Sequence, residues 1–535
     1  MEQTNSSRSR NRLGARDILA VSFVYVLSLL FVAGFPHPVA GFPLDDSWIH
    51  QVVARNLAQD GTLGFIPGVR SSGSSSLLWS LLLAAKWKFL PGMNPVVYSG
   101  LLSGFLFIVI GCGLLAMARK DGLPETSCWI WALTPALSGN FIWLGMLGME
   151  HVLFVALSVA GVYLWFQTSL RSAVACSLCL GALSMTRPEG MVLTVLMVLV
   201  WKKTQRGRRD LAMVIGVVAV CVLVTFTANF VTSHSWLPTT YAGRKLLYFG
   251  TEKIPLLFRI AFPYDLAKSI LRPWFPLQQH ILYPLKAIVV ALEAIGVIGL
   301  FRGRRLRTSV LCLWSFVHIA IYAVMLPSGS HGGRYQPLYL ALNFPLMFLG
   351  VEAIFRRLSL YFDSLRTRKV LQATAMVAAL IFGGYSLRMW REVTKDGIAV
   401  IESTHARMGK LLIDSLPRED KVAAFDIGRM GYLYGGDLID LGGLTDSSFL
   451  PYLREHRMIS YLEDRKISYF VWPVWPSNRD DYPLKPQILV MTPEITKNLV
   501  TIASFCSPVH EYKISFGATM MAAPCQTLYR LNDLH

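Results

Sequence analysis

Two adjacent carboxylates, Asp45 and Asp46, follow the first apolar stretch of the chain. A carboxylate within hydrogen-bond reach can accept a proton from a hydroxyl group as that group attacks a substrate. Two carboxylates can also hold a hard divalent cation such as Mg²⁺ or Ca²⁺, if phosphate oxygens and water molecules complete the coordination. Neighbouring side chains point in different directions, which argues against one shared site, so a divalent cation is an alternative and no cofactor is assigned. The pair suggests an enzyme that works at the membrane edge.

Further ionisable or polar residues stand at the ends of apolar segments, where charge is costly and often functional. An ordinary explanation exists for each: Arg187 and Glu189 can simply pair with each other and fix their tight loop, and Arg334 can be an interfacial anchor. Aromatic and basic loop residues can form a solvated face. The candidates are Glu150, Arg187, Glu189, Tyr241, Arg244 and Arg334.

The composition predicts a polytopic helical membrane protein. Hydrophobic residues make up 53% of the chain and charged residues only 16%, and the mean hydropathy is +0.45, which is not expected of a water-soluble protein of this length. A spanning helix needs roughly 20 mostly apolar residues at about 1.5 Å each. About eleven spans are predicted, at residues 18–35, 96–118, 128–144, 152–166, 173–185, 191–201, 211–231, 287–301, 310–326, 338–354 and 370–387.

The distribution of basic residues predicts the orientation. Lys and Arg gather in alternate loops, including 202–209, 302–307 and 356–369, whereas the short loops on the other side hold only Arg187 and Arg334. Such an excess marks cytoplasmic loops, so we expect a cytoplasmic N-terminus and an uncleaved first span. The net charge of +18 is then mainly a topology signal, and a nucleic-acid partner is not needed to explain it.

Two segments outside the predicted spans have internal structure. In the first outer loop, 36–94, apolar residues from Asp46 to Leu57 recur on one helical stripe, which predicts a helix along the membrane surface; residues 77–90 predict a second one. The tail, 393–535, contains strand-like runs at 421–426, 437–441 and 467–472 and a helical stretch at 452–464, a pattern typical of a small α/β domain. Cys506 and Cys525 in this tail could form a disulfide.

Short motifs spread over nearly the whole chain resemble one superfamily. They are LDDSWI at 44–49, ARNLA at 54–58, GFIPG at 64–68, SLLW at 76–79, GME at 148–150, TRPEG at 186–190, GRY at 333–335 and GGLTD at 442–446. In this order, and at the predicted outer face, they are similar to the GT-C membrane glycosyltransferases. The first outer loop looks closest to the branch that includes the mycobacterial terminal arabinofuranosyltransferases.

The resemblance implies transfer of a sugar from a polyprenyl-phosphate carrier to an acceptor hydroxyl of a glycan, glycolipid or protein. Asp45 is the predicted general base, because it precedes the surface helix and can project towards the membrane. Asp46 would orient the acceptor, bind a cation or share the base role; alternatively it only caps the helix. The leaving phosphate needs cationic support, for which Arg187, Arg244 and Arg334 are candidates.

The predicted organisation is a basic cytoplasmic N-terminus (1–17), a GT-C-like transmembrane domain (18–392) with its catalytic loop at 36–94, and a periplasmic α/β domain (393–535). The predicted location is the bacterial inner membrane. A transporter or flippase of lipid-linked sugars would also have many spans and intramembrane charges. Against that alternative, the sequence shows no internal repeat, and its polar residues collect at one face instead of at the midplane.

Overall fold

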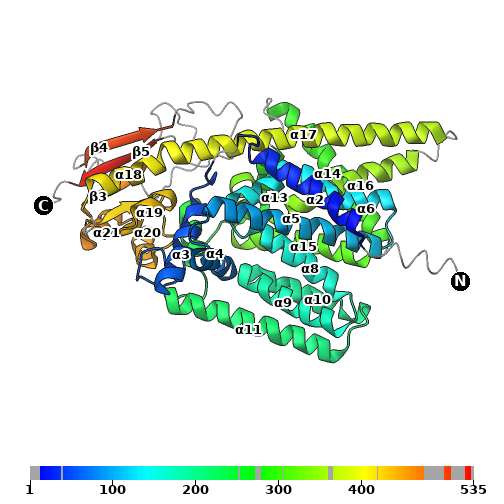
Figure 1. The fold of residues 1–535 in the computed structure, drawn as a ribbon, viewed down its shortest axis with the longest axis horizontal. Coiled ribbons are helices and arrows are strands. Elements are labelled where there is room, and N and C mark those ends of the chain that lie inside the picture. Colours follow the sequence, from blue (N-terminus) through cyan, green and yellow to red (C-terminus); the bar gives the residue numbers. More distant parts are fainter. Residues whose placement is uncertain are drawn as a thin grey trace.

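The computed structural model describes residues 13–37, 40–250, 253–271, 279–303, 305–358, 365–417, 420–474, 499–507 and 525–531. Within these residues, long helices form an elongated bundle and a small sheet domain lies at one end of it (Figure 1). The helices of the bundle include α2 (Ala15–Val32), α5 (Pro95–Lys120), α6 (Glu125–Leu133), α7 (Gly139–Trp143), α8 (His151–Trp165), α9 (Leu170–Thr186), α10 (Met191–Leu199), α11 (Arg208–Ser233), α13 (Leu256–Leu271), α14 (Gln279–Arg302), α15 (Leu306–Met325) and α16 (Pro337–Leu358).

Local signals explain where such a helix begins and ends. The Asn94 side chain accepts a hydrogen bond from the Val96 N–H at 2.8 Å, and Pro95 occupies the first turn of α5. Both features favour a helix N-terminus, since the first backbone N–H groups lack partners inside the helix. Beyond the last residue of α5, Gly122 adopts a φ of 69°, a left-handed conformation that ends helices.

The prediction of eleven spans is not confirmed. Among the described residues, five helices are long and apolar enough to cross a bilayer, namely α2, α5, α11, α15 and α16, and a bent helix pair brings the number to at most six. The bent pair, Glu125–Leu137 and Gly139–Leu147, turns by 59° where we expected one straight span at 128–144. Helices α8, α9 and α10 are shorter apolar helices.

The segment 36–94 contains the two predicted helices, α3 (Asp46–Asp60) and α4 (Leu77–Phe89), but α3 does not expose a polar face as a helix on a membrane surface would. His50 and Gln51, which we expected to face away from the apolar stripe, are buried. Ile49, Val52 and Val53 pack in one hydrophobic cluster with residues of the sheet domain. The helix is therefore enclosed between the bundle and the sheet domain (Figure 1).

The C-terminal domain contains a five-stranded mixed sheet of order β2-β1-β3-β5-β4. The three strands β1 (Val422–Ala424), β2 (Leu438–Asp440) and β3 (Tyr469–Val474) lie parallel, and β5 (Cys525–Leu531) pairs antiparallel with both β3 and β4 (Leu499–Cys506). These parallel strands fall on the three predicted runs. The helices of this domain are α18 (His405–Ser415), α19 (Gly428–Tyr434), α20 (Leu450–Arg454) and α21 (Met458–Asp464).

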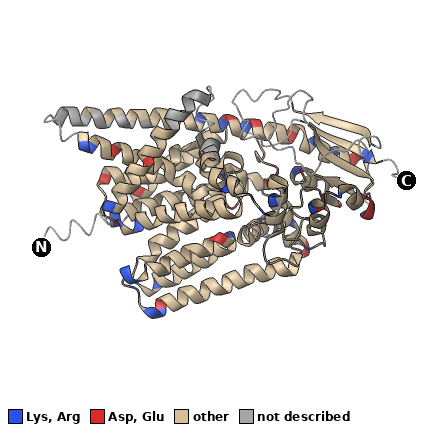
Figure 2. Ribbon diagram, turned by 180° about the vertical axis from the view of Figure 1, so that it is seen from behind, with Lys and Arg blue, Asp and Glu red and all other residues tan. Residues whose placement is uncertain are grey.

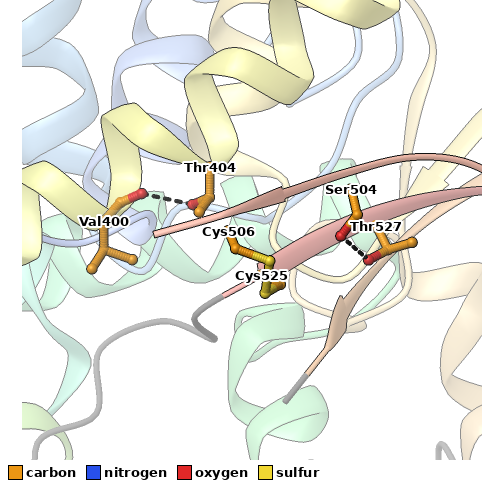
Figure 3. Close-up of a disulfide and its surroundings, with 6 residues drawn as sticks. All are labelled: Val400, Thr404, Ser504, Cys506, Cys525 and Thr527. Carbon is orange, nitrogen blue, oxygen red and sulfur yellow. Dashed lines mark hydrogen bonds between the residues drawn. A yellow bond between two sulfur atoms is a disulfide. The ribbon is translucent and has the colours of Figure 1, made fainter. Parts of the chain in front are cut away.

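The C-terminal domain differs from the prediction in one helix and contains the disulfide between its two cysteines. The expected helix at 452–464 is divided into α20 and α21, because His456 between them adopts a φ of 57°. Cys506 and Cys525 form the disulfide that the sequence left open, and it joins the paired ends of β4 and β5 (Figure 3).

Helix α17 (Leu365–Ser403) contains 39 residues and runs from the bundle into the C-terminal domain (Figure 1). The predicted eleventh span at 370–387 is only part of this helix, and the predicted domain boundary at 393 lies inside it. Figure 2 shows Lys and Arg gathered at the end of the bundle remote from the sheet, whereas few charged residues lie along the helices between the two ends. The molecule is thus an integral membrane protein with a strongly uneven charge distribution.

Candidate active site

Asp46 is held by two arginines that come from distant parts of the chain. Its Oδ2 accepts hydrogen bonds from Arg244 Nη2 at 2.8 Å and from Arg334 Nη2 at 2.6 Å. Arg244 lies on α12 (Thr239–Phe249), and Arg334 directly follows the short helix His331–Gly333. Burial alone would raise the pKa of Asp46, but the two guanidinium groups outweigh it and hold the pKa far below its usual range. This carboxylate is therefore ionised in the free protein.

Asp45 points elsewhere, which corrects the expectation that it projects towards the membrane. Its carboxylate oxygens accept hydrogen bonds from the backbone N–H groups of Gly428, at 2.6 Å, and Arg429, at 2.7 Å. A Cβ at position 428 would overlap the Asp45 backbone, so only glycine permits this approach. Burial raises the pKa of Asp45 to about 6, against the lowering influence of His405 and of the two N–H groups.

The two carboxylates consequently do not face one cation. Asp46 contacts guanidinium groups, whereas Asp45 converges with His405 and Asp426 of the C-terminal domain. The capping alternative is not observed either: Asp45 occupies the N-cap position of α3 but makes no side-chain capping bond, and the Asp46 side chain pairs with arginines. Consecutive helical residues diverge by about 100°, which separates the two side chains.

A second cluster contains the other predicted ionisable residues. Arg187 Nε lies 3.0 Å from Glu189 Oε1 and 3.9 Å from Glu150 Oε1, so the predicted pairing of Arg187 with Glu189 is present. Tyr322 on α15 accepts a hydrogen bond from Arg187 and donates one of 3.1 Å to Glu189. His318, one turn earlier on α15, lies 3.6 Å from the same Glu189 oxygen.

Aromatic rings and His50 join the two clusters. The Tyr322 and Tyr335 ring centroids are 5.6 Å apart, and the Tyr335 ring lies 5.5 Å from both the Arg244 and the Arg334 guanidinium carbons. His50, on the same helix α3 as Asp46, lies 3.8 Å from Glu150. We call this set the charged cluster; it comprises Asp46, His50, Glu150, Arg187, Glu189, Arg244, His318, Tyr322, Arg334 and Tyr335.

Of the predicted site residues, Asp46, Glu150, Arg187, Glu189, Arg244 and Arg334 come together, and Asp45 and Tyr241 do not join them. The Tyr241 hydroxyl donates to the Met325 carbonyl at 3.3 Å, and its ring contacts Lys245. His318 and Tyr322 were not predicted from the sequence. Their spacing of four residues inside an apolar helix was the available signal, because polar groups on one face of a span face the protein interior.

Backbone loops hold the charged cluster in place. Asp440, at the end of β2, accepts hydrogen bonds from the N–H groups of Gly442, Leu444 and Thr445 at 2.6–2.7 Å. The loop fixed in this way lies against Gly243, the residue before Arg244, with no room for a Cβ. The predicted GGLTD motif therefore acts as a backbone support for α12.

The arrangement favours chemistry on an anionic substrate. Guanidinium groups in low-dielectric surroundings bind phosphate oxygens through charge-assisted and often bidentate hydrogen bonds. A carboxylate between them can accept a proton if an incoming anion takes over its two partners. The cluster thus combines a group for binding a phosphate with a group for receiving a proton.

Comparisons with known proteins place the fold of this chain. A family model described as a domain of unknown function (DUF8728) matches residues 396–529. No curated protein sequence matches this chain significantly. Three solved structures illustrate the similarity in fold.

The archaeal oligosaccharyltransferase AglB from Archaeoglobus fulgidus, in complex with an inhibitory peptide and a dolichol-phosphate, has a TM-score of 0.54 and 11% identity, over 85% of this chain and 69% of AglB. ArnT from Cupriavidus metallidurans, bound to undecaprenyl phosphate, has a TM-score of 0.53 and 12% identity, over 96% of this chain and 97% of ArnT. The arabinofuranosyltransferase AftD from Mycobacteria has a TM-score of 0.48 and 16% identity, over 98% of this chain and 42% of AftD, which does not discriminate between branches. This chain has the fold of the GT-C membrane glycosyltransferases.

Proposed function

We propose that this protein transfers a sugar from a polyprenyl-phosphate donor to an acceptor hydroxyl at the outer face of a bacterial inner membrane. The observation that carries the proposal is the pairing of Asp46 with Arg244 and Arg334. Support also comes from the solved ArnT complex of the same fold, which contains undecaprenyl phosphate. The acceptor would be a glycan, glycolipid or protein of the cell envelope.

In the proposed reaction, Asp46 is the proton acceptor, which revises our expectation for Asp45. The donor phosphate binds Arg244 and Arg334 and thereby releases Asp46 from its ion pairs. The acceptor oxygen then attacks the anomeric carbon, its proton passes to Asp46, and the bond from that carbon to the phosphate oxygen breaks. The polyprenyl phosphate leaves with the bonding electron pair, and a single displacement inverts the anomeric configuration.

The rest of the charged cluster has a supporting part in this proposal. Arg187 has an Nη1 group that is buried and has no hydrogen-bond partner among the described residues. An unpaired buried guanidinium nitrogen is costly, and a phosphate or sugar oxygen would satisfy it. Glu150, which also keeps one oxygen without a hydrogen-bond partner among those residues, can accept a bond from a sugar hydroxyl. We therefore assign Arg187 and Glu150 to the donor.

The test is transfer of radiolabelled sugar in membranes, from a panel of polyprenyl-phosphate sugars to endogenous acceptors. We expect transfer by the wild type and a loss of at least about 100-fold in Asp46→Asn, a magnitude typical of removing a general base. The matched control is Asp60→Asn, an exposed carboxylate at the other end of α3, which should transfer at the wild-type rate.

Two outcomes would contradict the proposal. Equal transfer by the wild type and a correctly inserted Asp46→Asn would exclude Asp46 as the proton acceptor. Movement of the donor across the bilayer without formation of a glycosidic bond would support the flippase alternative, because a transferase makes a new bond and a flippase only relocates its lipid.

A further inference from the structure

Three ligand-type side chains that do not belong to the charged cluster come together. They are Asp45 itself, His405 at the start of α18 and Asp426 two residues after β1. One oxygen or nitrogen atom of each lies within 4.8 Å of the others. His405 is fully buried and Asp45 is 7% exposed. Asp426 is 24% exposed, and carboxylates this close together in a largely buried site need a compensating positive charge.

The protonation of His405 can be derived from its neighbours. The Thr404 hydroxyl donates its only proton to the Val400 carbonyl at 2.6 Å (Figure 3). The same hydroxyl lies 2.8 Å from His405 Nδ1, so it accepts a hydrogen bond there and Nδ1 carries a proton. In the neutral imidazole, the lone pair is then on Nε2, which lies 3.4 Å from Asp426 Oδ2. An orienting bond of this kind is characteristic of histidines that ligate metals.

The side chain of Gln526 on β5 is an independent indication that a ligand binds between Asp45, His405 and Asp426. Its side chain is fully buried, and its Oε1 has no hydrogen-bond partner among the described residues. Its Nε2 lies 3.2 Å from His405 Nε2 and 2.9 Å from Asp426 Oδ2. A half-turn of the amide would direct the unsatisfied oxygen to the point on which the three other side chains converge, where it could serve as a ligand.

We propose that Asp45, His405 and Asp426 bind one zinc ion, with the Gln526 amide oxygen or a water molecule as the fourth ligand. One imidazole nitrogen and carboxylate oxygens are a donor set that Zn²⁺ accepts in four-coordinate geometry. The ion would supply the positive charge that one buried carboxylate, one partly exposed carboxylate and a neutral imidazole lack. The backbone N–H groups of Gly428 and Arg429 orient the Asp45 carboxylate for this role.

The zinc ion would connect the first outer loop to the C-terminal domain. Asp45 belongs to the loop, and the other ligands belong to α18 and to the segment after β1. Since Asp45 immediately precedes Asp46, such a connection would fix the start of α3 without contact between the ion and the proposed reacting groups. The inference goes beyond the proposed function and does not depend on sugar transfer.

The test uses the purified full-length protein in detergent, without its affinity tag and after removal of bound metal with a chelator. Zinc is added back, and the amount retained after gel filtration is measured by elemental analysis. We expect one equivalent in the wild type and in the control Asp437→Asn, an exposed carboxylate of the same domain. His405→Ala and Asp426→Asn should each bind zinc at least about tenfold more weakly.

X-ray absorption spectroscopy of the wild-type zinc complex makes the test independent of whether the variants fold. A single imidazole among nitrogen and oxygen neighbours is expected. The proposal is overturned if the wild type retains no more zinc than His405→Ala, or if the spectrum contains no imidazole ligand. His405 would then be a protonated imidazolium between two carboxylates.

Discussion

The adjacent residues Asp45 and Asp46 have carboxylates that contact different parts of the molecule. Asp46 is 24% exposed and pairs with two arginines, whereas the buried Asp45 contacts backbone N–H groups of the C-terminal domain. Asp46 is ionised because of its partners, and Asp45 is fixed because of its surroundings. A substitution of Asp46 should therefore reduce sugar transfer. A substitution of Asp45 should instead weaken the attachment of the segment 36–94 to the C-terminal domain.

Replacing Arg334 by Lys tests the proposed phosphate contact. The guanidinium is 1% exposed and makes bonds through Nε and Nη2, to Ser330 and Asp46, whereas an ammonium group cannot bind two oxygens in a planar fork. We expect transfer to fall by about 10- to 100-fold, which corresponds to the loss of about one hydrogen bond to a charged group. Initial rates at varied donor concentration should show a raised KM.

The control for this substitution is Arg457→Lys, which removes an exposed guanidinium that pairs with Glu455 in the C-terminal domain. It should leave both kcat and KM unchanged. An unchanged KM for the donor in Arg334→Lys would contradict a role of Arg334 in phosphate binding.

The hydroxyl of Tyr322 is a second point at which the charged cluster can be tested. It accepts a bond from Arg187 and donates one to Glu189. In Tyr322→Phe these buried charged groups lose a shared partner, at a cost of about 1–3 kcal/mol in the free energy of unfolding. The melting temperature in detergent should decrease.

Tyr241→Phe is the matched control for Tyr322→Phe, because its hydroxyl makes a single hydrogen bond of 3.3 Å to an exposed backbone carbonyl. It should melt close to the wild type. Equal melting temperatures for the wild type and Tyr322→Phe would show that the hydroxyl does not stabilise the cluster.

The residue types of the cluster could be predicted from the sequence, but their mutual orientation could not. Arg187 and Arg334 stand out because arginines are scarce in the short loops of one side, whereas Arg244 lies in the longer loop after the predicted seventh span. Which of two consecutive carboxylates faces those arginines depends on how the C-terminal domain packs against α3, a contact between residues hundreds of positions apart. His405 and Asp426 could not be connected with Asp45 for the same reason.

At the level of elements, the contact between α12 and the loop after β2 determines where Arg244 lies. Gly243 of α12 faces the backbone of Gly442 and Gly443 with no space for a side chain. The Asp440 carboxylate fixes this loop through three backbone N–H groups. A Cβ at position 243 must therefore displace the helix, and not only a flexible side chain.

Gly243→Ala should reduce transfer by at least about tenfold, because a displacement of about 1 Å can cost a factor of about 100 in rate. Insertion in the membrane should be unaffected. The control is Gly216→Ala on α11, where an added Cβ meets no atom within 4 Å. Transfer assays on both variants in membranes give the comparison, and equal rates would contradict the proposed positioning of Arg244 by α12.

The existence of elements was easier to predict than their limits. Each predicted span overlaps a helix, since long apolar runs in a membrane protein must satisfy their backbone groups internally. The bend at 138 and the continuation of α17 beyond residue 387 were not predicted. The bend involves a contact between Gly139 and Ser386 of another helix, and the Asp396-Gly397 pair inside α17 is a dipeptide typical of turns. Strands β4 and β5, by contrast, were not among the strand-like runs predicted from the sequence.

For the whole molecule, the charge distribution predicts one orientation in the membrane. The basic loop at 202–209 and the described basic residues at 302, 305 and 307 lie at the end of the bundle remote from the sheet, as Figure 2 illustrates. If that end is cytoplasmic, then Asp437→Cys in right-side-out vesicles should react with a membrane-impermeant maleimide, and Arg209→Cys should react only after permeabilisation.

The wild type, with free cysteines in or beside helices of the bundle, provides the background labelling for this experiment. Labelling of Arg209→Cys, but not of Asp437→Cys, in sealed vesicles would reverse the orientation. The charged cluster would then face the cytoplasm, and a donor from the outer leaflet could not reach it.

Helix α17 limits how sequences of this fold can change in length. The helix is continuous for 39 residues, about 58 Å at 1.5 Å per residue, and it leads directly into α18. One inserted residue would rotate the C-terminal domain by about 100° and shift it by about 1.5 Å relative to the bundle. Such an insertion would leave every side chain chemically intact while separating α3 from the domain that encloses it. The length of the helix therefore sets both the distance and the rotation between the bundle and the C-terminal domain. Substitutions on its exposed surface change neither quantity.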